Sequence, residues 1–151
     1  MDIYLFNDLD NPNFLFHGSP KKLDVIEQRQ AHDSDGNADN EDYAAFLTSS
    51  FIMASAYAFK DRIKELSEGL DYNFEIGYDP DSHNVNIVFE NVNVDDDMEG
   101  FVYVFPFSEQ YEHHGRSIQY KSHEDIEPMD VVTVRFGDFK QHYQINNPIT
   151  R

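Results

Sequence analysis

The stretch "FLFHGSPKKL", residues 14–23, decides how this chain is interpreted. It opens with an apolar run, Phe14 to Phe16, which predicts a short buried strand. His17, Gly18 and Ser19 follow directly. This tripeptide, followed by a proline, is typical of a tight turn, because glycine accepts a positive φ and proline fixes the next bend. The same residues also suit the floor of a ligand site, so two interpretations stand at this point.

The composition predicts one folded domain over residues 1–151, with 40% hydrophobic and 15% aromatic residues. A chain of this length can bury a core without disulfide or metal staples. It contains no cysteine, which excludes a disulfide scaffold, a thiol nucleophile and a thiolate metal site.

The formal net charge is −18. Such a charge disfavours direct binding to nucleic acid or to an anionic membrane, and leaves basic protein partners open. The first residues, "MDIYLFNDLDNP", have no basic segment followed by a long apolar one, and no stretch of the chain reaches membrane-spanning length. We therefore expect a cytoplasmic protein that does not enter membranes.

The first half of the chain predicts a loop, a strand and a helix. Residues 31–43 are acidic and polar, which predicts a surface loop, and their spacing does not match an EF-hand calcium loop. Residues 43–48, "YAAFLT", predict a strand. Residues 49–69 predict a helix capped by Ser49 or Ser50 and ended by Gly69. The residues expected on its core face are Ile52, Ala56, Phe59, Ile63 and Leu66.

The second half of the chain predicts antiparallel sheet. Apolar segments at 72–78 and 84–92 flank a turn-rich joint and predict a hairpin. Residues 99–107, "EGFVYVFPF", are apolar on both faces and predict a central strand. Residues 117–122 predict a short strand, and residues 131–139, "VVTVRFGDF", predict a final one. The class is therefore α+β, with one long helix in the N-terminal half.

Common enzyme and metal motifs are absent from the sequence. His113 and His114 are adjacent and have no third ligand at metal spacing nearby, so no metal site is predicted. The chain has no G-x-S-x-G, no P-loop and no G-x-G-x-x-G.

Three segments nevertheless follow one another in an order that can be compared with that of known enzyme families. A strand ends in His17-Gly18-Ser19, "AAFLTSS" runs into a helix that contains Tyr57, and "SIQYKSHEDIEPMDVVTVRF" comes late in the chain. This order resembles the ADP-ribosyltransferase family, both the diphtheria-toxin-like enzymes and the poly-ADP-ribose polymerases. The resemblance implies two small antiparallel sheets that form a cleft, with NAD or a related nucleotide as ligand and a protein as a possible acceptor of ADP-ribose.

The resemblance also implies roles for single residues. His17 would hydrogen-bond a ribose hydroxyl, the backbone of Gly18 would hold the nicotinamide amide, and Ser19 would add a ribose contact. The family's stacking tyrosine falls on Phe46 or, in a second alignment, on Leu47. Tyr43 and Tyr57 are reserve candidates for packing against the nicotinamide.

The family's catalytic glutamate falls on Gln119. Glutamine keeps the hydrogen bond to the ribose 2′-hydroxyl but cannot stabilise the positive charge that develops on the ribose, and losing such a group costs about 10²- to 10³-fold in rate. Glu112 and Glu124 are near enough in sequence to substitute. NAD binding is therefore expected, with transfer slower than in the family.

Two other functions stay open. The charge of −18 and the missing glutamate also suit a non-enzymatic acidic protein on the same scaffold, which would bind a basic partner. An RNA phosphotransferase or nucleotide hydrolase would need arginine near phosphate. The arginines to check for that chemistry are Arg29, Arg62, Arg116 and Arg135.

Overall fold

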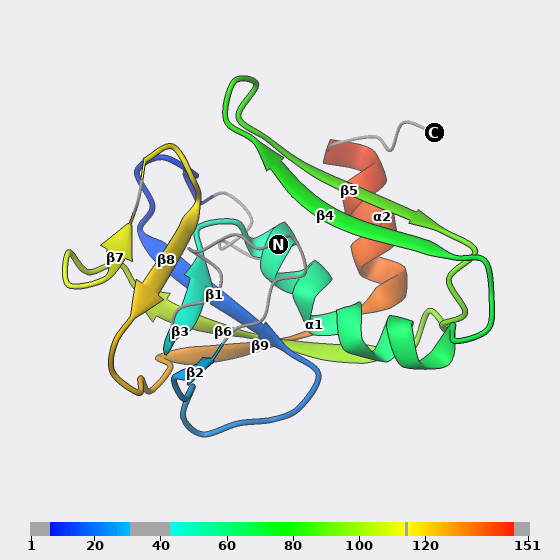
Figure 1. The fold of residues 1–151 in the computed structure, drawn as a ribbon, viewed down its shortest axis with the longest axis horizontal. Coiled ribbons are helices and arrows are strands. Elements are labelled where there is room, and N and C mark those ends of the chain that lie inside the picture. Colours follow the sequence, from blue (N-terminus) through cyan, green and yellow to red (C-terminus); the bar gives the residue numbers. More distant parts are fainter. Residues whose placement is uncertain (1–6, 31–42, 114, 147–151) are drawn as a thin grey trace.

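The computed structural model describes residues 7–30, 43–113 and 115–146. The predicted acidic loop at 31–43 therefore lies outside the described residues, except for Tyr43. The protein mixes α and β structure, with two antiparallel sheets and two helices in the described part (Figure 1). None of these helices has the length and apolar content needed to cross a membrane.

The larger sheet has seven strands, and every strand pair in it is antiparallel. Six strands follow the order β7–β8–β3–β1–β6–β9, and β2 pairs separately with β3. The strands are β1 (Phe14–Ser19), β2 (Arg29–Gln30), β3 (Tyr43–Thr48), β6 (Glu99–Pro106), β7 (Glu112–His113), β8 (Gln119–Ser122) and β9 (Asp130–Arg135). The strands predicted at 43–48, 99–107 and 117–122 are confirmed, and β6 is central as expected.

Side chains of the larger sheet form two separate apolar clusters, one on each face. On one face Phe16 and Val102 pack with Phe51 and Ala54 of helix α1 (Phe51–Leu66), and the Phe16 and Phe51 rings meet edge to face at 5.5 Å. The other face buries Leu15, Leu47, Tyr103, Tyr120 and their neighbours beneath Ile26 and Ile126. Helix α1 thus covers β1 and β6 and identifies the first face, here called the helix face.

Helix α1 follows the sequence expectation closely. The Ser50 hydroxyl accepts a hydrogen bond from the Met53 N–H at 3.0 Å, and Gly69 takes a positive φ of 86° just after the helix ends. Of the predicted core face, Ala56, Phe59 and Ile63 are buried and Ile52 is partly buried. Leu66 was predicted wrongly: it is 41% exposed, because the apolar cluster reaches only as far as Ile63.

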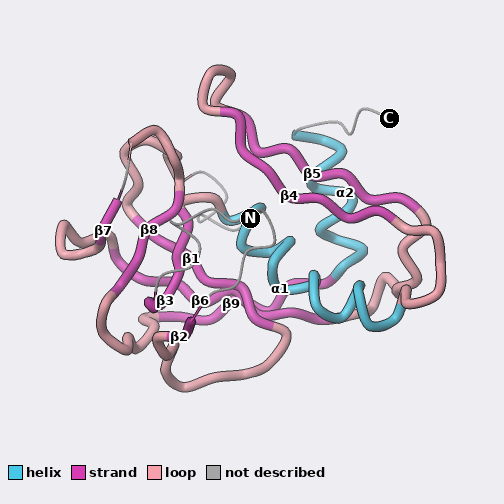
Figure 2. The backbone as a smooth tube through the Cα atoms, in the orientation of Figure 1, coloured by secondary structure: helices cyan, strands magenta, loops and turns pink. Residues whose placement is uncertain are grey.

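The smaller sheet is the predicted hairpin of β4 (Asn73–Asp79) and β5 (Asn84–Glu90). It lies alongside helix α2 (Phe136–Asn146), and its tip extends toward β7 and β8 (Figures 1 and 2). Its inner side chains join the cluster that also holds Phe59 and Phe136.

Helix α2 corrects the expectation of a strand over 131–139 and of a single long helix. Strand β9 ends at Arg135, and the helix begins at the next residue. Phe136 and Phe139 are buried against Phe59, with ring centroids 5.4 and 5.5 Å from it. Helical spacing brings both rings to one side, which a strand could not do for residues three apart.

Candidate functional site

The structure brings the three resembling segments together on adjacent strands of the larger sheet. Strand β3 lies between β1 and β8. Phe16 of β1 pairs with Thr48 of β3, and Thr48 pairs with Gln119 of β8. The candidate residues therefore lie within one sheet, whereas the resemblance implied a cleft between two small sheets.

His17, Gly18 and Ser19 do not form a turn, so that interpretation of the opening stretch is wrong. All three belong to β1 and pair with residues 101–103 of β6. Turn geometry begins only at Ser19, whose hydroxyl accepts a hydrogen bond from the Lys21 N–H at 3.1 Å. The apolar run at 14–16 is thus the first half of a longer strand.

The backbone of Gly18 points toward β3. Successive residues of an antiparallel strand direct their N–H and C=O groups alternately to the two neighbouring strands. The Phe107 N–H donates to the Asn13 carbonyl at 3.0 Å, which places Asn13 among the residues that bond toward β6. Gly18 is five residues from Asn13, an odd number, so its N–H and C=O point to the opposite side of β1, toward β3. We call these two backbone groups the Gly18 edge.

Strand pairing does not extend to this edge. Among the described residues, β1 pairs with β3 at Phe16 and Thr48 alone, although continued pairing would set Gly18 opposite Phe46. The His17 ring bridges the strands there instead, with Nδ1 2.8 Å from the Phe46 carbonyl oxygen. The ladder between β1 and β3 thus ends one step before the residues that the resemblance singles out.

The same side of β1 already binds a carboxamide within the chain. The Asn7 side chain donates to the Phe14 carbonyl at 2.9 Å and accepts from the Phe14 N–H at 3.1 Å. Its amide also donates to the Ser49 carbonyl at 2.8 Å, which ties β1 to the end of β3. Phe14 and Gly18 are four residues apart, so their backbone N–H and C=O groups point to the same side of β1. A primary amide can therefore pair with the backbone along this side of the strand. Sequence reasoning missed Asn7, because no pattern distinguishes it from other polar loop residues.

The absence of a side chain at Gly18 has a packing cause. A Cβ added there would lie 1.8 Å from the Ala54 carbonyl oxygen and 2.8 Å from the Ala58 nitrogen. Gly100 meets the same helix, since its Cβ would lie 2.8 Å from the Ala58 Cβ. Glycine therefore lets α1 approach the sheet, and access by a ligand is not needed to explain this residue.

Beyond α1, the helix face carries polar side chains. Residues directly opposite each other in a sheet share a face. Phe46 pairs with Lys121 of β8, which pairs with Glu112 of β7. Gln119 lies two residues from Lys121 on the same strand and so shares this face. These four side chains, of which Phe46 is apolar and Lys121 is buried, lie beside the Gly18 edge and are here called the β3–β8–β7 surface.

The two substitute carboxylates lie at different places. Glu112 is on the β3–β8–β7 surface, and its Oε1 lies 3.5 Å from His123 Nε2. Glu124 follows the end of β8 and is exposed. Its N–H donates to the Ser122 hydroxyl at 3.2 Å, so the chain bends after β8 and carries Glu124 away from the line of the strand. Placement thus favours Glu112 over Glu124 as a partner for a ligand near Gln119.

The aromatic candidates are also separated by the fold. Phe46 is partly buried on the helix face, whereas Leu47 is buried on the opposite face with Tyr120. Tyr57 is 44% exposed on α1, with Lys60 Nζ 5.5 Å from the centre of its ring. Tyr43 begins β3 opposite Gln30 of β2.

Tyr120 follows Gln119 on β8 and stays protonated. Burial raises the pKa of its hydroxyl above the ordinary 10.0, and the negative charge of Asp10 raises it further. Its ring stacks on His113 at 4.3 Å. Tyr120 therefore supplies packing and a neutral hydroxyl, and it does not serve as a general base at neutral pH.

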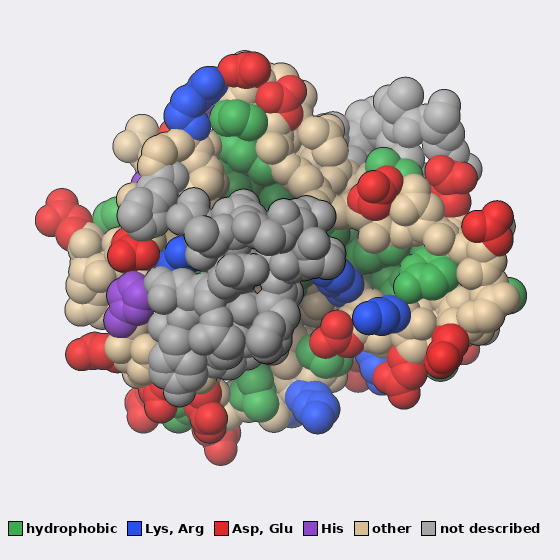
Figure 3. Space-filling model, viewed as in Figure 1, with side chains coloured by type: hydrophobic (Ala, Val, Ile, Leu, Met, Phe, Trp, Pro, Cys, Tyr) green, Lys and Arg blue, Asp and Glu red, His purple; other side chains and the backbone are tan. Residues whose placement is uncertain are grey.

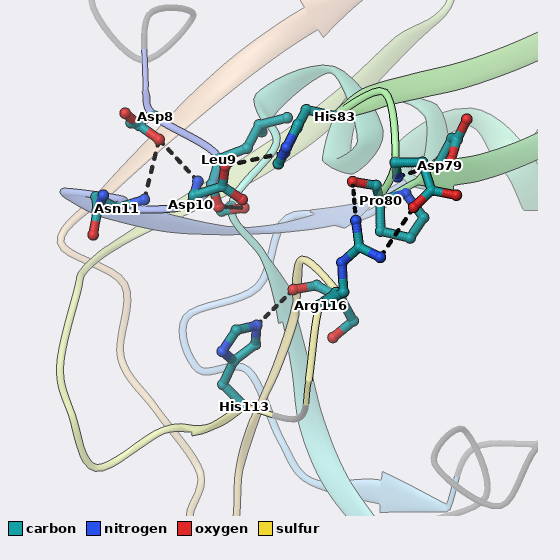
Figure 4. Close-up of polar contacts among 12 residues, drawn as sticks. Asp8, Leu9, Asp10, Asn11, Asp79, Pro80, His83, His113 and Arg116 are labelled. Carbon is teal, nitrogen blue, oxygen red and sulfur yellow. Dashed lines mark hydrogen bonds and ion pairs between the residues drawn. The ribbon is translucent and has the colours of Figure 1, made fainter.

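The hairpin tip contacts two segments that lead into the site. Arg116 donates to the Pro80 carbonyl at 2.9 Å and pairs with Asp81 at 3.0 Å, and His83 pairs with Asp10 at 3.1 Å (Figure 4). These side chains are more than half exposed, so each pair adds little stability.

The arginines give little support to phosphate chemistry at the site. Arg116 bonds the hairpin, Arg135 lies 3.9 Å from Asp97, and Arg62 is exposed on α1. Arg29 is in β2, opposite Ala44. Arg62, Arg116 and Arg135 thus place no arginine fork on the β3–β8–β7 surface.

We also searched the described residues for groups of metal ligands and for hollows in the surface. In the described part of the chain, no group of three His, Asp or Glu side chains could hold a metal ion. A hollow of about 330 Å³ lies away from the candidate residues, between β5 and α2, and is lined by residues that include Phe89 and Lys140. Its lining includes Phe136, the last residue of the third resembling segment, but none of the candidate site residues. We therefore place the candidate site at the Gly18 edge and the β3–β8–β7 surface.

No family model, no curated protein and no solved structure matches this chain.

Proposed function

We propose that this protein is an ADP-ribosyltransferase-like protein that binds NAD, or a related nucleotide, by its nicotinamide carboxamide. The observation that carries the proposal is the Gly18 edge. Its backbone N–H and C=O point toward β3 at a place where β1 and β3 are no longer paired among the described residues. The Asn7 amide, bound at Phe14 on the same side of β1, supports the choice of a carboxamide as the ligand group.

In this arrangement the ligand amide continues the sheet. The Gly18 N–H donates to the carboxamide oxygen, and the Gly18 C=O accepts from the carboxamide NH₂. His17 and Phe46 lie on the two strands that border the edge. His17 pairs with Tyr103 and so shares the face opposite to Phe46. His17 would then orient a ribose hydroxyl from one side of the edge, and Phe46 would pack against the nicotinamide ring or its ribose from the other.

Transfer would break the bond between ribose C1′ and the nicotinamide nitrogen. The bonding electron pair leaves with nicotinamide, which becomes neutral, and a nucleophilic oxygen or nitrogen of a protein acceptor bonds to C1′ and loses its proton to water. Gln119 holds the 2′-hydroxyl but has no charge to stabilise the oxocarbenium-like state, which slows transfer by about 10²- to 10³-fold relative to a carboxylate. Binding is therefore expected to be more evident than catalysis.

Calorimetry with nicotinamide and NAD tests binding directly. We expect both to bind the wild type and NAD to bind His17→Ala more weakly. His113→Ala is the matched control, because that ring stacks on Tyr120, whereas the His17 ring contacts the Phe46 carbonyl beside the Gly18 edge. Failure of the wild type to bind either ligand would overturn the proposal.

Transfer is tested separately with labelled NAD and cell lysate. We expect slow labelling of protein by the wild type, loss of labelling in His17→Ala, and faster labelling by Gln119→Glu. Equal labelling by all three proteins would exclude a role for His17 and Gln119.

Acidic side chains favour a second function, binding of a basic protein without catalysis. They are spread over the visible face of the molecule and outnumber the basic ones there (Figure 3). A basic partner captured at low salt and released at high salt, by a protein indifferent to NAD, would support this function instead.

A further inference from the structure

Two hollows adjoin at the end of the molecule opposite β7 and β8 (Figure 1). The first, of about 330 Å³, lies between the end of β5 and α2. The second, of about 290 Å³, lies between the connection from α1 to β4 and the connection from β5 to β6. Asn91 and Val92 line both hollows, so the short segment that follows β5 separates one from the other.

Hydrogen bonds hold this dividing segment in place. The Asn91 side-chain amide donates to the Asp71 carbonyl at 3.1 Å. The Asn93 N–H donates to the Ser67 hydroxyl at 2.8 Å, and its side-chain amide donates to the Leu66 carbonyl at 3.0 Å. Because the segment is fastened to the end of α1 and to the next connection, both hollows are already formed. A partner would not have to order this segment on binding, which favours affinity.

Apolar side chains form much of the lining of the two hollows. Phe89 and Phe136 are buried in the first, and Val92 is partly buried where the hollows meet. Leu70 lines the second hollow and is 51% exposed. Leu70 and the hollows therefore offer adjoining apolar area that a second molecule can remove from water.

The rim of the hollows is acidic. The bordering segments contain three acidic residues in 65–71 and four in 90–97, and neither segment contains a basic residue. Among the described residues, Asp71 and Glu90 enter no ion pair, whereas Lys140 of the first hollow lies 2.7 Å from Asp96. A positively charged side chain can therefore pair with Asp71 or Glu90, and an acidic one would be repelled.

We propose that the two hollows and their rim dock a basic segment of a partner protein, one that carries apolar side chains between its lysines or arginines. The apolar side chains enter the hollows on either side of Val92, and the basic ones pair with Asp71 and Glu90. A second copy of this chain is an unfavourable occupant, because each copy has a charge of −18. The surface shares no residue with the Gly18 edge, so the inference goes beyond nucleotide binding and does not depend on it.

The test uses a short peptide in which lysine and leucine alternate, titrated into isotope-labelled protein at about 0.15 M salt and followed by NMR. We expect the largest amide shifts at residues 70–71 and 89–94. Asp71→Asn combined with Glu90→Gln should weaken binding about twofold to thirtyfold, the range of two exposed ion pairs. Glu109→Gln combined with Glu127→Gln is the matched control, because it removes the same charge from exposed positions before β7 and β9.

Two further comparisons test the apolar part of the surface. Leu70→Ser should weaken binding about fourfold to tenfold, because half of this side chain is still exposed in the free protein. Leu23→Ser is its control, since Leu23 is 39% exposed on the connection that follows β1. A peptide of equal charge that alternates lysine with serine should bind more weakly than the lysine–leucine peptide.

Several results would overturn the docking surface. Amide shifts spread over the whole acidic surface, equal affinity of the two peptides, or equal weakening by the control variants would reduce the interaction to general charge attraction. Absence of binding would also overturn it. A dimer of the protein alone in sedimentation, lost in Leu70→Ser, would assign the surface to a second copy instead. None of these results bears on nicotinamide binding by calorimetry, so the two proposals can fail independently.

Discussion

Replacement of Gly18 by alanine tests the packing on which the site depends. The added Cβ would lie 1.8 Å from the Ala54 carbonyl oxygen, whereas side-chain carbons essentially never approach closer than 3.0 Å. Relief of this overlap requires a shift of about 1.2 Å between α1 and β1. The obstacle is helix backbone, so no side-chain rotation can remove it.

The cost follows from what such a shift would loosen. Helix α1 packs on β1 through Phe51 and Ala54, and the Phe51 ring contacts Phe16. A gap of 0.5–1 Å already loses a quarter to a half of the attraction between packed atoms. Overpacked cores lose about 1–3 kcal/mol, and we place Gly18→Ala near 3 kcal/mol because the clash is with backbone. For a chain of this size that predicts a melting temperature lower by about 6–12 °C.

The assay is thermal and urea unfolding, followed by circular dichroism. Gly77→Ala is the matched control, because Gly77 also lies in a strand and its added Cβ would meet the Asn86 carbonyl oxygen at an unstrained 4.0 Å. We expect this control to change the free energy of unfolding by less than about 0.5 kcal/mol. If Gly18→Ala melts within about 2 °C of the wild type, α1 does not lie against β1 as described.

Two further predictions concern a side-chain anchor and the tyrosines. Asn7→Ala removes the amide that bonds Phe14 and Ser49, so we expect the free energy of unfolding in urea to fall by about 1–3 kcal/mol. Asn73→Ala is the control and should change it little, because the Asn73 amide bonds the exposed Glu75 side chain. Equal stabilities of the two variants would contradict the anchoring role of Asn7. Burial raises the pKa of four tyrosine hydroxyls above 10.0, those of Tyr78, Tyr103, Tyr111 and Tyr120. The stability that these groups contribute is therefore complete below pH 10 and is lost as pH rises through the folded pKa values. Ionisation of all tyrosines near pH 10 with unchanged stability, measured by ultraviolet absorbance titration, would refute this prediction.

Local patterns were enough to predict most of the elements. Helix α1 has a serine cap, a helical apolar period and a glycine after its end, and all three signals agree. Helix α2 has no such agreement. Its first turn contains Gly137, a poor helix former, and Phe136 and Phe139 are its buried residues within the part whose burial is described. Burial of those two rings against Phe59 stabilises the helix, and that contact is not visible in the local sequence.

The candidate site residues come from the sequence, whereas their geometry could not be predicted from it. The resemblance pointed to His17, Gly18 and Gln119, and the fold places the first two on β1 and Gln119 on β8, with β3 between these strands. The Gly18 edge, however, depends on which way a backbone amide points and on where pairing with β3 ends. Neither is set by residue type. The Asn7 amide at Phe14 depends likewise on a loop meeting a strand edge.

The polar residues of β8 are electrostatically consistent with each other. Gln119 and Lys121 lie two residues apart on the same face, about 6.6 Å along the strand. A glutamate at 119 would stand beside a buried cation, which would stabilise its charge and offset part of its effect on a developing oxocarbenium ion. The gain in rate expected from Gln119→Glu is therefore the net of two opposing effects.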